Sequence, residues 1–453
     1  MAERVPIWRQ RRYQLGTLFV AIAFVAVLVG NNLLARQYTP DGAVRQYLAA
    51  LQAGDATEAW DVIQVMAPTA SVAATVTDKS ALQAALAAGE PDIKDFTVTG
   101  SSQLDATTTA VEVTYDTSAG SQQAKFLVQP SGQTHFGIYP VLHVVITPTI
   151  LQITLPKGSS GVSIDGKLVA LPQGTSSVAV LPVAHRLQLN GTALLAGQTV
   201  SVDAFYSLAQ SVSYTPALTS DGLAKAKAAI SAAFTACTKQ TSLRPAGCPQ
   251  SETNGFVSSG QWQLVGDPTQ DLAIGFDKNL NPVATGHFQM VIAYQEDGYT
   301  GTLHDASSGG YSAGLLLTAS DVTVISITSD NGLADLQRPA AATDQAAEAL
   351  VKAAFTQCAG ARASAQADCP QKLFAADPSN ISWQLSGDPL SGATVSFDQQ
   401  SGVLTVQGTF NMTATYYIIG YSYTGSSDTT TYKAYLLWDG QALKLVTISG
   451  DFS

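Results

Sequence analysis

Two stretches of the chain repeat each other at a spacing of 121 residues, and this internal repeat limits what the sequence can fold into. Each stretch contains two cysteines separated by ten residues, then a tryptophan that leads into a Gly-Asp-Pro turn. These elements are Cys237, Cys248 and Trp262–Pro268 in the first stretch, and Cys358, Cys369 and Trp383–Pro389 in the second. A constant spacing of this kind predicts two folded modules of one type rather than an active site assembled from dispersed residues.

The N-terminal region carries the signals of a membrane anchor. Residues 15–35 contain no charged side chain, and about 20 such residues span a bilayer as a helix. Arg4, Arg9, Arg11 and Arg12 precede this run, so the positive-inside bias predicts a cytoplasmic tail over 1–13 and a transmembrane helix over 14–36. We therefore expect a single-pass plasma-membrane protein with an extracytoplasmic C-terminal body. A cleaved signal peptide is the alternative, but no Ala-x-Ala-like cleavage site follows the run.

Charge and cysteine usage fit an exported body. The formal net charge of −11 disfavours binding to nucleic acid, although acidity can also serve solubility alone. In an oxidising compartment the two cysteine pairs predict one disulfide in each copy. Zinc is the alternative, but neither pair has a second Cys or His at ligand spacing, so no metal and no cofactor is expected.

Composition and periodicity predict an α+β protein with four domains after the membrane helix. Residues 37–145 begin with helical spacing and continue with alternating strands. Residues 146–215 contain strand and turn signals, among them an Asp-Gly hairpin tip at Asp165-Gly166. The two remaining domains are the repeats, 216–332 and 338–453, each with its disulfide.

Each repeat is expected to pack one helix on a curved antiparallel sheet. The helices are predicted over 224–237 and 345–358. Apolar and polar residues then alternate along 282–294 and 404–416, which predicts one long strand in each repeat with one buried face. Gly286 and Gly408 mark where so long a strand would bend.

Several of these segments resemble known families. Residues 43–55 resemble the first helix of nuclear-transport-factor-like domains, which ends at Gly-Asp before the next helix starts, and the repeats resemble cystatin-like or nuclear-transport-factor-like cones. Residues 162–189 are similar to a PEGA-type β module. The order of these parts resembles the bacterial TcaA-type membrane proteins linked to glycopeptide response. That resemblance implies a cell-envelope role without catalysis.

No catalytic constellation stands out in the sequence. Gly310–Gly314 matches the Gly-x-Ser-x-Gly elbow of hydrolases, but the elbow requires a strand-to-helix turn, whereas Ser312 leads into an apolar strand. We therefore interpret Ser312 as part of a hairpin and His287 as a solvated histidine on the wet face of its strand. His304-Asp305 is adjacent in sequence, which is a weak signal for an acid-base pair. His135, His143 and His185 have no partner at ligand spacing.

Tyrosines provide the candidate binding surface, because they can stack on sugars or pack against a partner protein. The candidates lie near the expected open ends of the two cones: Tyr294, Tyr299, Tyr416, Tyr417, Tyr421 and Tyr423. The alternative is that they continue the core face and cap the sheet edge. The sequence favours a protein that is not an enzyme and that binds or scaffolds cell-envelope components, either an envelope protein or cell-wall glycan. The alternative is an envelope sensor or receptor with a small or glycan ligand inside a cone-shaped pocket.

Overall fold

The computed structural model describes residues 38–450 apart from 89–92, 118–119, 136, 160, 206–208 and 213. The predicted cytoplasmic tail and transmembrane helix lie outside these residues. Within the described part of the chain, no helix is both long and apolar enough to cross a membrane. The fold is α+β with a predominance of curled sheets, in agreement with the predicted class. The chain divides into two compact units, and the division falls at Thr215/Pro216, with residues 193–196 belonging to the second unit.

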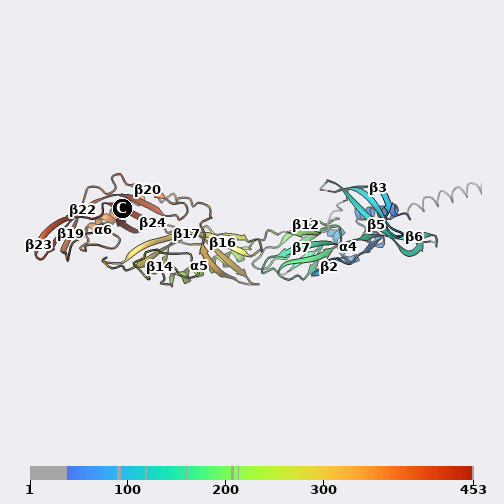
Figure 1. Ribbon diagram of the computed structural model, residues 1–453, viewed down its shortest axis with the longest axis horizontal. Helices are drawn as coiled ribbons and strands as arrows, with labels where there is room; N and C mark the ends of the chain where they lie inside the picture. The colour runs from blue at the N-terminus through green and yellow to red at the C-terminus, as the bar shows by residue number, and fades with distance from the viewer. Residues whose placement is uncertain are drawn as a thin grey trace, which may run out of the picture. The chain divides into compact units, whose positions relative to one another are not determined.

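The first unit begins with three helices and a five-stranded sheet of order β1-β6-β5-β4-β3. The elements are α2 (Pro40–Ala53), α3 (Ala56–Asp61), β1 (Ile63–Val65), α4 (Lys79–Ala88), β3 (Asp95–Gln103), β4 (Thr109–Thr117), β5 (Gly120–His135) and β6 (Tyr139–Ile146). Tyr47 and Leu48 of α2 are buried with Phe126 of β5 in one core cluster. Figure 1 shows β3, β5 and β6 of this sheet in cyan to teal.

Local chemistry explains where α2 ends and α3 begins. Thr39 caps α2 by accepting a hydrogen bond from the backbone of Gly42, and Pro40 occupies the first turn, where no donor is needed. Gly54 closes the helix in the left-handed conformation at φ 71°, and Asp55 caps the next helix. The Gly-Asp helix boundary expected from the sequence is therefore present.

Two four-stranded sheets complete the first unit, with orders β13-β7-β10-β2 and β12-β11-β8-β9. Their strands are β2 (Ala74–Val76), β7 (Thr149–Leu155), β8 (Val162–Ile164), β9 (Lys167–Val169), β10 (Gly174–Val180), β11 (Ala184–Leu189), β12 (Gln198–Asp203) and β13 (Ala209–Val212). The β8–β9 hairpin turns at Asp165-Gly166, both with positive φ, as the sequence predicted. Because β2 pairs in parallel with β10, a strand from residues expected in one domain lies in the sheet of the next.

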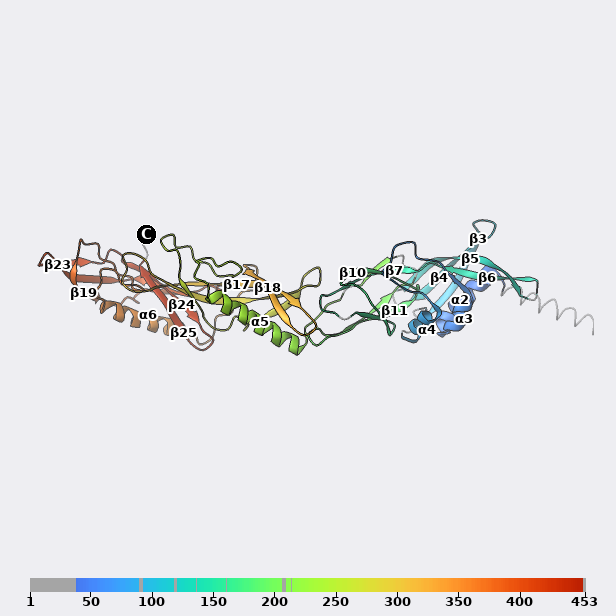
Figure 2. The same ribbon diagram turned by 90° about the horizontal axis from the view of Figure 1, so that it is seen from below.

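The second unit contains the two repeat segments, and each has a helix on one side of curled antiparallel sheet. The first module has α5 (Ser220–Thr238), β14 (Gln261–Leu264), β15 (Ala273–Phe276), β16 (Pro282–Tyr294), β17 (Leu303–Leu317) and β18 (Val322–Ser329). The second module has α6 (Asp344–Ala359), β19 (Ser379–Ser386), β20 (Thr394–Phe397), β21 (Leu404–Thr409), β22 (Asn411–Ile418), β23 (Tyr421–Ser426), β24 (Thr431–Trp438) and β25 (Leu443–Gly450). Figure 2 shows α5 along the sheet of β17 and β18, and α6 along β24 and β25.

The same buried contacts hold each helix on its sheet. The ring of Phe234 meets that of Tyr311 edge to face at 5.1 Å between centroids, and Phe355 meets Tyr432 in the same way at 4.9 Å. The tyrosine hydroxyls donate to the carbonyls of Pro268 and Pro389 at 2.7 and 3.0 Å. Phe234 and Phe355 are fully buried against each sheet, on the side where the alternative hypothesis placed a ligand pocket.

Each tyrosine lies over a glycine on the neighbouring strand. Gly286 is paired with Tyr311 and Gly408 with Tyr432. A Cβ at either glycine would lie about 3.0 Å from the tyrosine hydroxyl oxygen, closer than ordinary packing allows. We expected these glycines to permit a bend, and the structure adds a second reason for them: the ring needs the space that a side chain would occupy.

The two modules differ in how far their strands continue. β16 alternates buried and partly exposed residues without interruption, as predicted. The single strand expected over 404–416 is instead divided into β21 and β22, and the backbone N–H of Phe410, at the break, donates to Thr430 O. Opposite the break, Ser427 N donates to Met412 O, and Asp428 and Thr429 interrupt the pairing. Asp428 N donates to Lys372 O, and Thr429 Oγ1 donates to Pro370 O.

Candidate functional site

Both predicted disulfides are present, as Cys237–Cys248 and Cys358–Cys369. A buried glutamine supports each one from the same position: the side-chain amides of Gln250 and Gln371 donate to the carbonyls of Cys237 and Cys358. Each loop is thereby fixed to the end of its helix. Disulfides of this kind fit a non-cytoplasmic compartment.

The six candidate tyrosines do not form one surface. Tyr294 is buried, and its hydroxyl donates to the carboxylate of Asp305. The ring of Tyr299 lies under the ammonium of Lys372, 4.9 Å from the ring centroid. Tyr416 stacks on Tyr423 at 5.8 Å. Tyr294 thus lies in the core, the alternative given for it above, and the tyrosines of the second module lie near one another on one hairpin.

That hairpin joins β22 to β23 and ends in an unusual turn. Ile418 pairs with Tyr421, so Ile419 and Gly420 form a two-residue loop, and both have positive φ, at 48° and 82°. This is the pattern of a type I′ turn, in which Asn or Gly is favoured and a β-branched residue is strained. We define the hairpin tip as Tyr417, Ile419, Tyr421 and Tyr423, whose exposed fractions are 39%, 92%, 71% and 45%.

His287 departs most clearly from its expected role. We expected a solvated histidine, but its side chain is only 10% exposed. Its Nδ1 lies 2.6 Å from Oδ2 of Asp271, and its backbone N–H donates to Oδ1 of the same carboxylate at 3.1 Å. The histidine was expected to face water because it lies on the polar face of β16. The linker after the first module covers that face, which the period of the strand alone cannot show.

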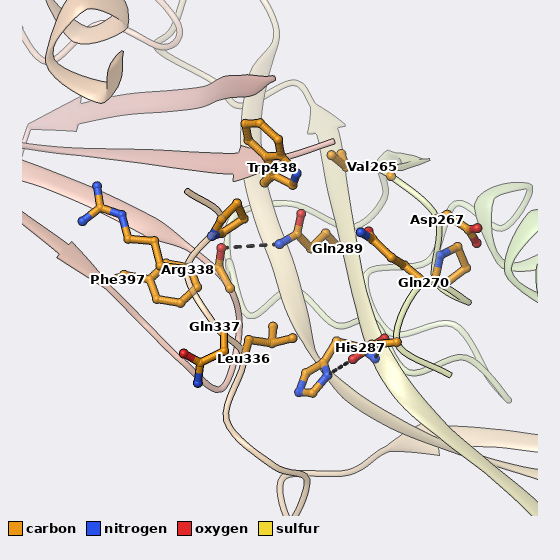
Figure 3. Close-up of a pocket in the computed structure, with 15 residues that line it drawn as sticks. Val265, Asp267, Gln270, His287, Gln289, Leu336, Gln337, Arg338, Phe397 and Trp438 are labelled. Atoms are coloured by element: carbon orange, nitrogen blue, oxygen red, sulfur yellow. Dashed lines mark hydrogen bonds and ion pairs between the residues drawn. The ribbon is translucent and has the colours of Figure 1, made fainter. Parts of the chain in front are cut away.

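A cavity of about 500 Å³ opens beside His287, between the first module and residues of the second. It is lined by Val265, Gly266, Asp267, Pro268, Gln270, Asp271, His287, Gln289, Leu336, Gln337, Arg338, Pro339, Phe397, Gly402 and Trp438. Figure 3 shows the His287 imidazole turned away from Val265 and toward the region of Leu336. The volume of the cavity is within the range of small-molecule binding sites.

Two polar atoms in this lining are buried and, within the described chain, have no hydrogen-bond partner: Nε2 of His287 and Oε1 of Gln289. The amide nitrogen of Gln289 is 3.4 Å from the carbonyl of Gly402, and Figure 3 shows the free oxygen on the side of Trp438. Arg338 is occupied outside the cavity, since it donates to Ala342 O and to the carboxylate of Asp344, both at 2.6 Å.

Ser312 does not complete a catalytic group with this histidine. It lies within β17, opposite Thr285, in a strand that pairs antiparallel with its neighbours, as expected for part of a hairpin. It shares a sheet face with His287, whose cross-strand partner is Gly310. Because Nε2 of His287 bonds to no side chain in the described residues, the serine and the histidine do not form a nucleophile–base pair.

His304 pairs with a carboxylate other than its neighbour in sequence. Its Nδ1 lies 2.6 Å from Oδ2 of Asp368, which belongs to the second module, and Thr447 donates to the other oxygen. Asp305 instead accepts from Tyr294. Burial raises the pKa of Asp305 to about 6, with the carboxylates of Glu252 and Asp368 adding to the effect. His304 and Asp305, which were only a weak candidate for an acid-base pair, thus have separate partners: His304 contacts Asp368 of the second module, and Asp305 accepts a hydrogen bond from Tyr294.

His185 also has a partner that its sequence context did not indicate. Its ring is buried, with Nδ1 2.6 Å from Asp165 Oδ2 and Nε2 2.7 Å from Leu181 O. Both ring nitrogens are satisfied, so this histidine ties the Asp165-Gly166 turn to β11 and is available for no other chemistry.

Comparison of the two modules could have identified the His287 pair from sequence. Gly286–Phe288 correspond to Gly408–Phe410, so Thr409 takes the place of His287, and Gly392 takes the place of Asp271. Both members of the pair are thus absent together from the second module. Among the described residues, no three His, Cys, Asp or Glu side chains are grouped to hold a metal ion. No protein-family model matches the chain, and a comparison with curated proteins gives no significant match.

Proposed function

We propose that the chain is a single-pass, plasma-membrane protein whose extracytoplasmic body binds or scaffolds another envelope protein without catalysing a reaction. The uncharged run in 15–35 supports the anchor, and the two disulfides support the compartment. The order of parts resembles TcaA-type envelope proteins, with two copies of one helix-on-sheet module at the C-terminal end. In this proposal the modules serve as a scaffold that presents a binding element.

The hairpin tip is the observation that carries this proposal. An exposed isoleucine contributes no burial to the fold, and a β-branched residue at φ 48° costs conformational free energy on the order of 1 kcal/mol or more. Asn or Gly at Ile419 would avoid both costs. A contact that buries Ile419 in a partner would offset them.

The composition of the tip fits a protein groove. All four side chains are aromatic or aliphatic, and the three tyrosines add hydroxyls that can bond at the rim of an interface. Tyrosine is common among residues that dominate binding energy, because it buries a large rigid surface at low entropic cost. The stacking of Tyr416 on Tyr423 holds the base of the hairpin in place before binding.

Site-specific photo-crosslinking in intact membranes tests the proposal. A photoreactive residue replaces Tyr421 in one variant and Ile325 in another, since Ile325 is also exposed but lies on β18 of the first module. We expect one defined envelope protein to be crosslinked from position 421, and the product to disappear in a background that carries Ile419→Asn. Equal crosslinking from both positions, or a product that survives Ile419→Asn, would contradict a role for the tip.

A further inference from the structure

Two hydrogen-bonding atoms of residues that line the cavity beside His287 are buried and have no partner among the described residues, and neither is open to the cavity as it stands. Nε2 of His287 and Oε1 of Gln289 are two positions apart on β16, so they face the same side of the sheet. Leaving a buried polar atom without a partner costs about 1–3 kcal/mol. A ligand that pairs with both atoms would recover this free energy on binding.

The geometry at His287 narrows the kind of group that can pair with it. The carboxylate of Asp271 accepts from Nδ1, so Nδ1 carries its proton and Nε2 is an acceptor in the neutral ring or a donor in the charged ring. A hydroxyl can bond to either form, because it both donates and accepts. Oε1 of Gln289 requires a donor, which a second hydroxyl provides.

The side chains and charges that line the cavity further restrict the class of ligand that it can bind. Leu336, Phe397 and Trp438 supply apolar and aromatic surface on which the flat face of a sugar ring can pack. The Arg338 guanidinium is bonded to Asp344, and Figure 3 shows it pointing outward, while Asp267 and Asp271 contribute negative charge. An anionic ligand would be repelled, and a neutral one would not.

We propose that this cavity is a binding site for a neutral sugar, with a ring packed against Trp438, and that small side-chain adjustments expose Nε2 of His287 and Oε1 of Gln289 to one hydroxyl each. The site lies between the two modules rather than inside either cone. It is also distinct from the hairpin tip, so it stands or falls independently of the proposed protein partner.

The second module supplies replacements that the fold already accommodates. It builds the equivalent strand and turn with Thr409, Asn411 and Gly392, where the first module has His287, Gln289 and Asp271. Leu317 of the first module corresponds in turn to Trp438. Substitutions taken from these positions remove the ligand contacts with little risk to the scaffold.

The test measures the binding of cellobiose and N,N′-diacetylchitobiose to the full chain by saturation-transfer NMR and by calorimetry. Glucuronate is the anionic comparison. We expect both neutral sugars to bind and glucuronate to bind more weakly. His287→Thr and Trp438→Leu should each weaken binding about tenfold or more. Thr409→His, the reverse change in the second module, should leave binding unchanged.

Three results would overturn the proposal. One is no saturation transfer from either neutral sugar at about 10 mM, where even weak sites are occupied. Another is undiminished binding by His287→Thr with a near-UV circular dichroism spectrum like that of the unaltered chain. The third is preferential binding of glucuronate. If the His287→Thr variant does not show the native spectrum, the Gln289→Asn and Trp438→Leu variants replace it in the binding test, because they leave the Asp271–His287 contact in place. Undiminished sugar binding by both would then overturn the proposal.

Discussion

In the first module β16 runs from Pro282 to Tyr294 without a break, whereas its counterpart in the second module is divided into β21 and β22. The buried faces of the two modules are nevertheless alike. Each has a phenylalanine from its helix against a tyrosine, a glycine beneath that tyrosine, and a disulfide supported by a buried glutamine. The modules differ in side chains that lie outside these shared buried contacts.

Those differences are concentrated in three places. His287 and Asp271 border a cavity, and the second module has Thr409 and Gly392 instead. Tyr294 bonds to Asp305 in the first module, whereas its counterpart, Tyr416, stacks on Tyr423 in the second. The third place is the hairpin tip, because residues 295–302 join β16 to β17 where the second module has the two-residue turn Ile419-Gly420. The shared core can therefore be tested first, and two of these differences after it.

The largest expected effect tests the shared core. Phe234→Ala and Phe355→Ala each remove a fully buried ring that contacts two other aromatic rings, at a cost of about 3–5 kcal/mol in free energy of unfolding. Urea unfolding of each full-length variant should show similar losses. If one variant lost less than half as much free energy of unfolding as the other, the two cores would not be equivalent.

Removing one disulfide at a time is the next test of equivalence. The two bridges close loops of the same length, with a sequence separation of 11, so each double Cys→Ala variant should lose about 3 kcal/mol on the chain-entropy model. Thermal unfolding with and without reductant measures this, because reductant should abolish the difference between each variant and the unaltered chain. A difference that persists in reductant would point to lost packing instead.

Asp305 should give the first module a pH dependence that the second lacks. Its folded pKa, about 6, is above the ordinary value near 3.9, so its contribution to stability is present below pH 4 and is lost as the pH rises through 6. Asp305→Asn keeps an acceptor for Tyr294 and removes this loss. At pH 8 we expect the variant to be about 1–3 kcal/mol more stable than the unaltered chain, and at pH 4 to be similar. Equal gains at both pH values would exclude titration of Asp305 as the cause.

The smallest expected effect is a gain in stability at the hairpin tip. Ile419→Asn places a favoured residue at φ 48°, and we expect the free energy of unfolding to rise by about 1 kcal/mol. Differential scanning calorimetry, with Ile325→Asn as the control for loss of an exposed isoleucine, measures the change. A variant that is less stable than the control would show that Ile419 packs within the fold and is not strained for binding.

Much of the scaffold could be predicted from local patterns. Thr39-Pro40 and Gly54-Asp55 carry the capping chemistry that bounds α2, and the alternation along 282–294 is the burial pattern of β16. The cysteine spacing indicated the disulfides. The alternation along 404–416 was equally regular but did not reveal the break at Phe410, because the residues opposite it, Asp428 and Thr429, bond to Lys372 and Pro370, which follow the second disulfide loop.

The candidate site could be predicted only in part. Tyr417, Tyr421 and Tyr423 lie on the hairpin tip, but no sequence pattern indicated Ile419, whose strain follows from the length of the turn. Tyr294 was placed on a surface and is buried. His287 was assigned to water because period-two alternation separates two faces and says nothing about what covers the polar one.

The sequence by itself thus determined the elements whose cause is local or repeated: the helix caps, the strand alternation, the cysteine pairs and the 121-residue spacing of the modules. Only the tertiary structure decided which residues meet across modules. His304 meets Asp368, and residues 336–339 cover His287 and Gln289 to leave a cavity. The physical reason is that such contacts join residues tens of positions apart, and their geometry is set by how the two sheets pack rather than by any pattern along the chain.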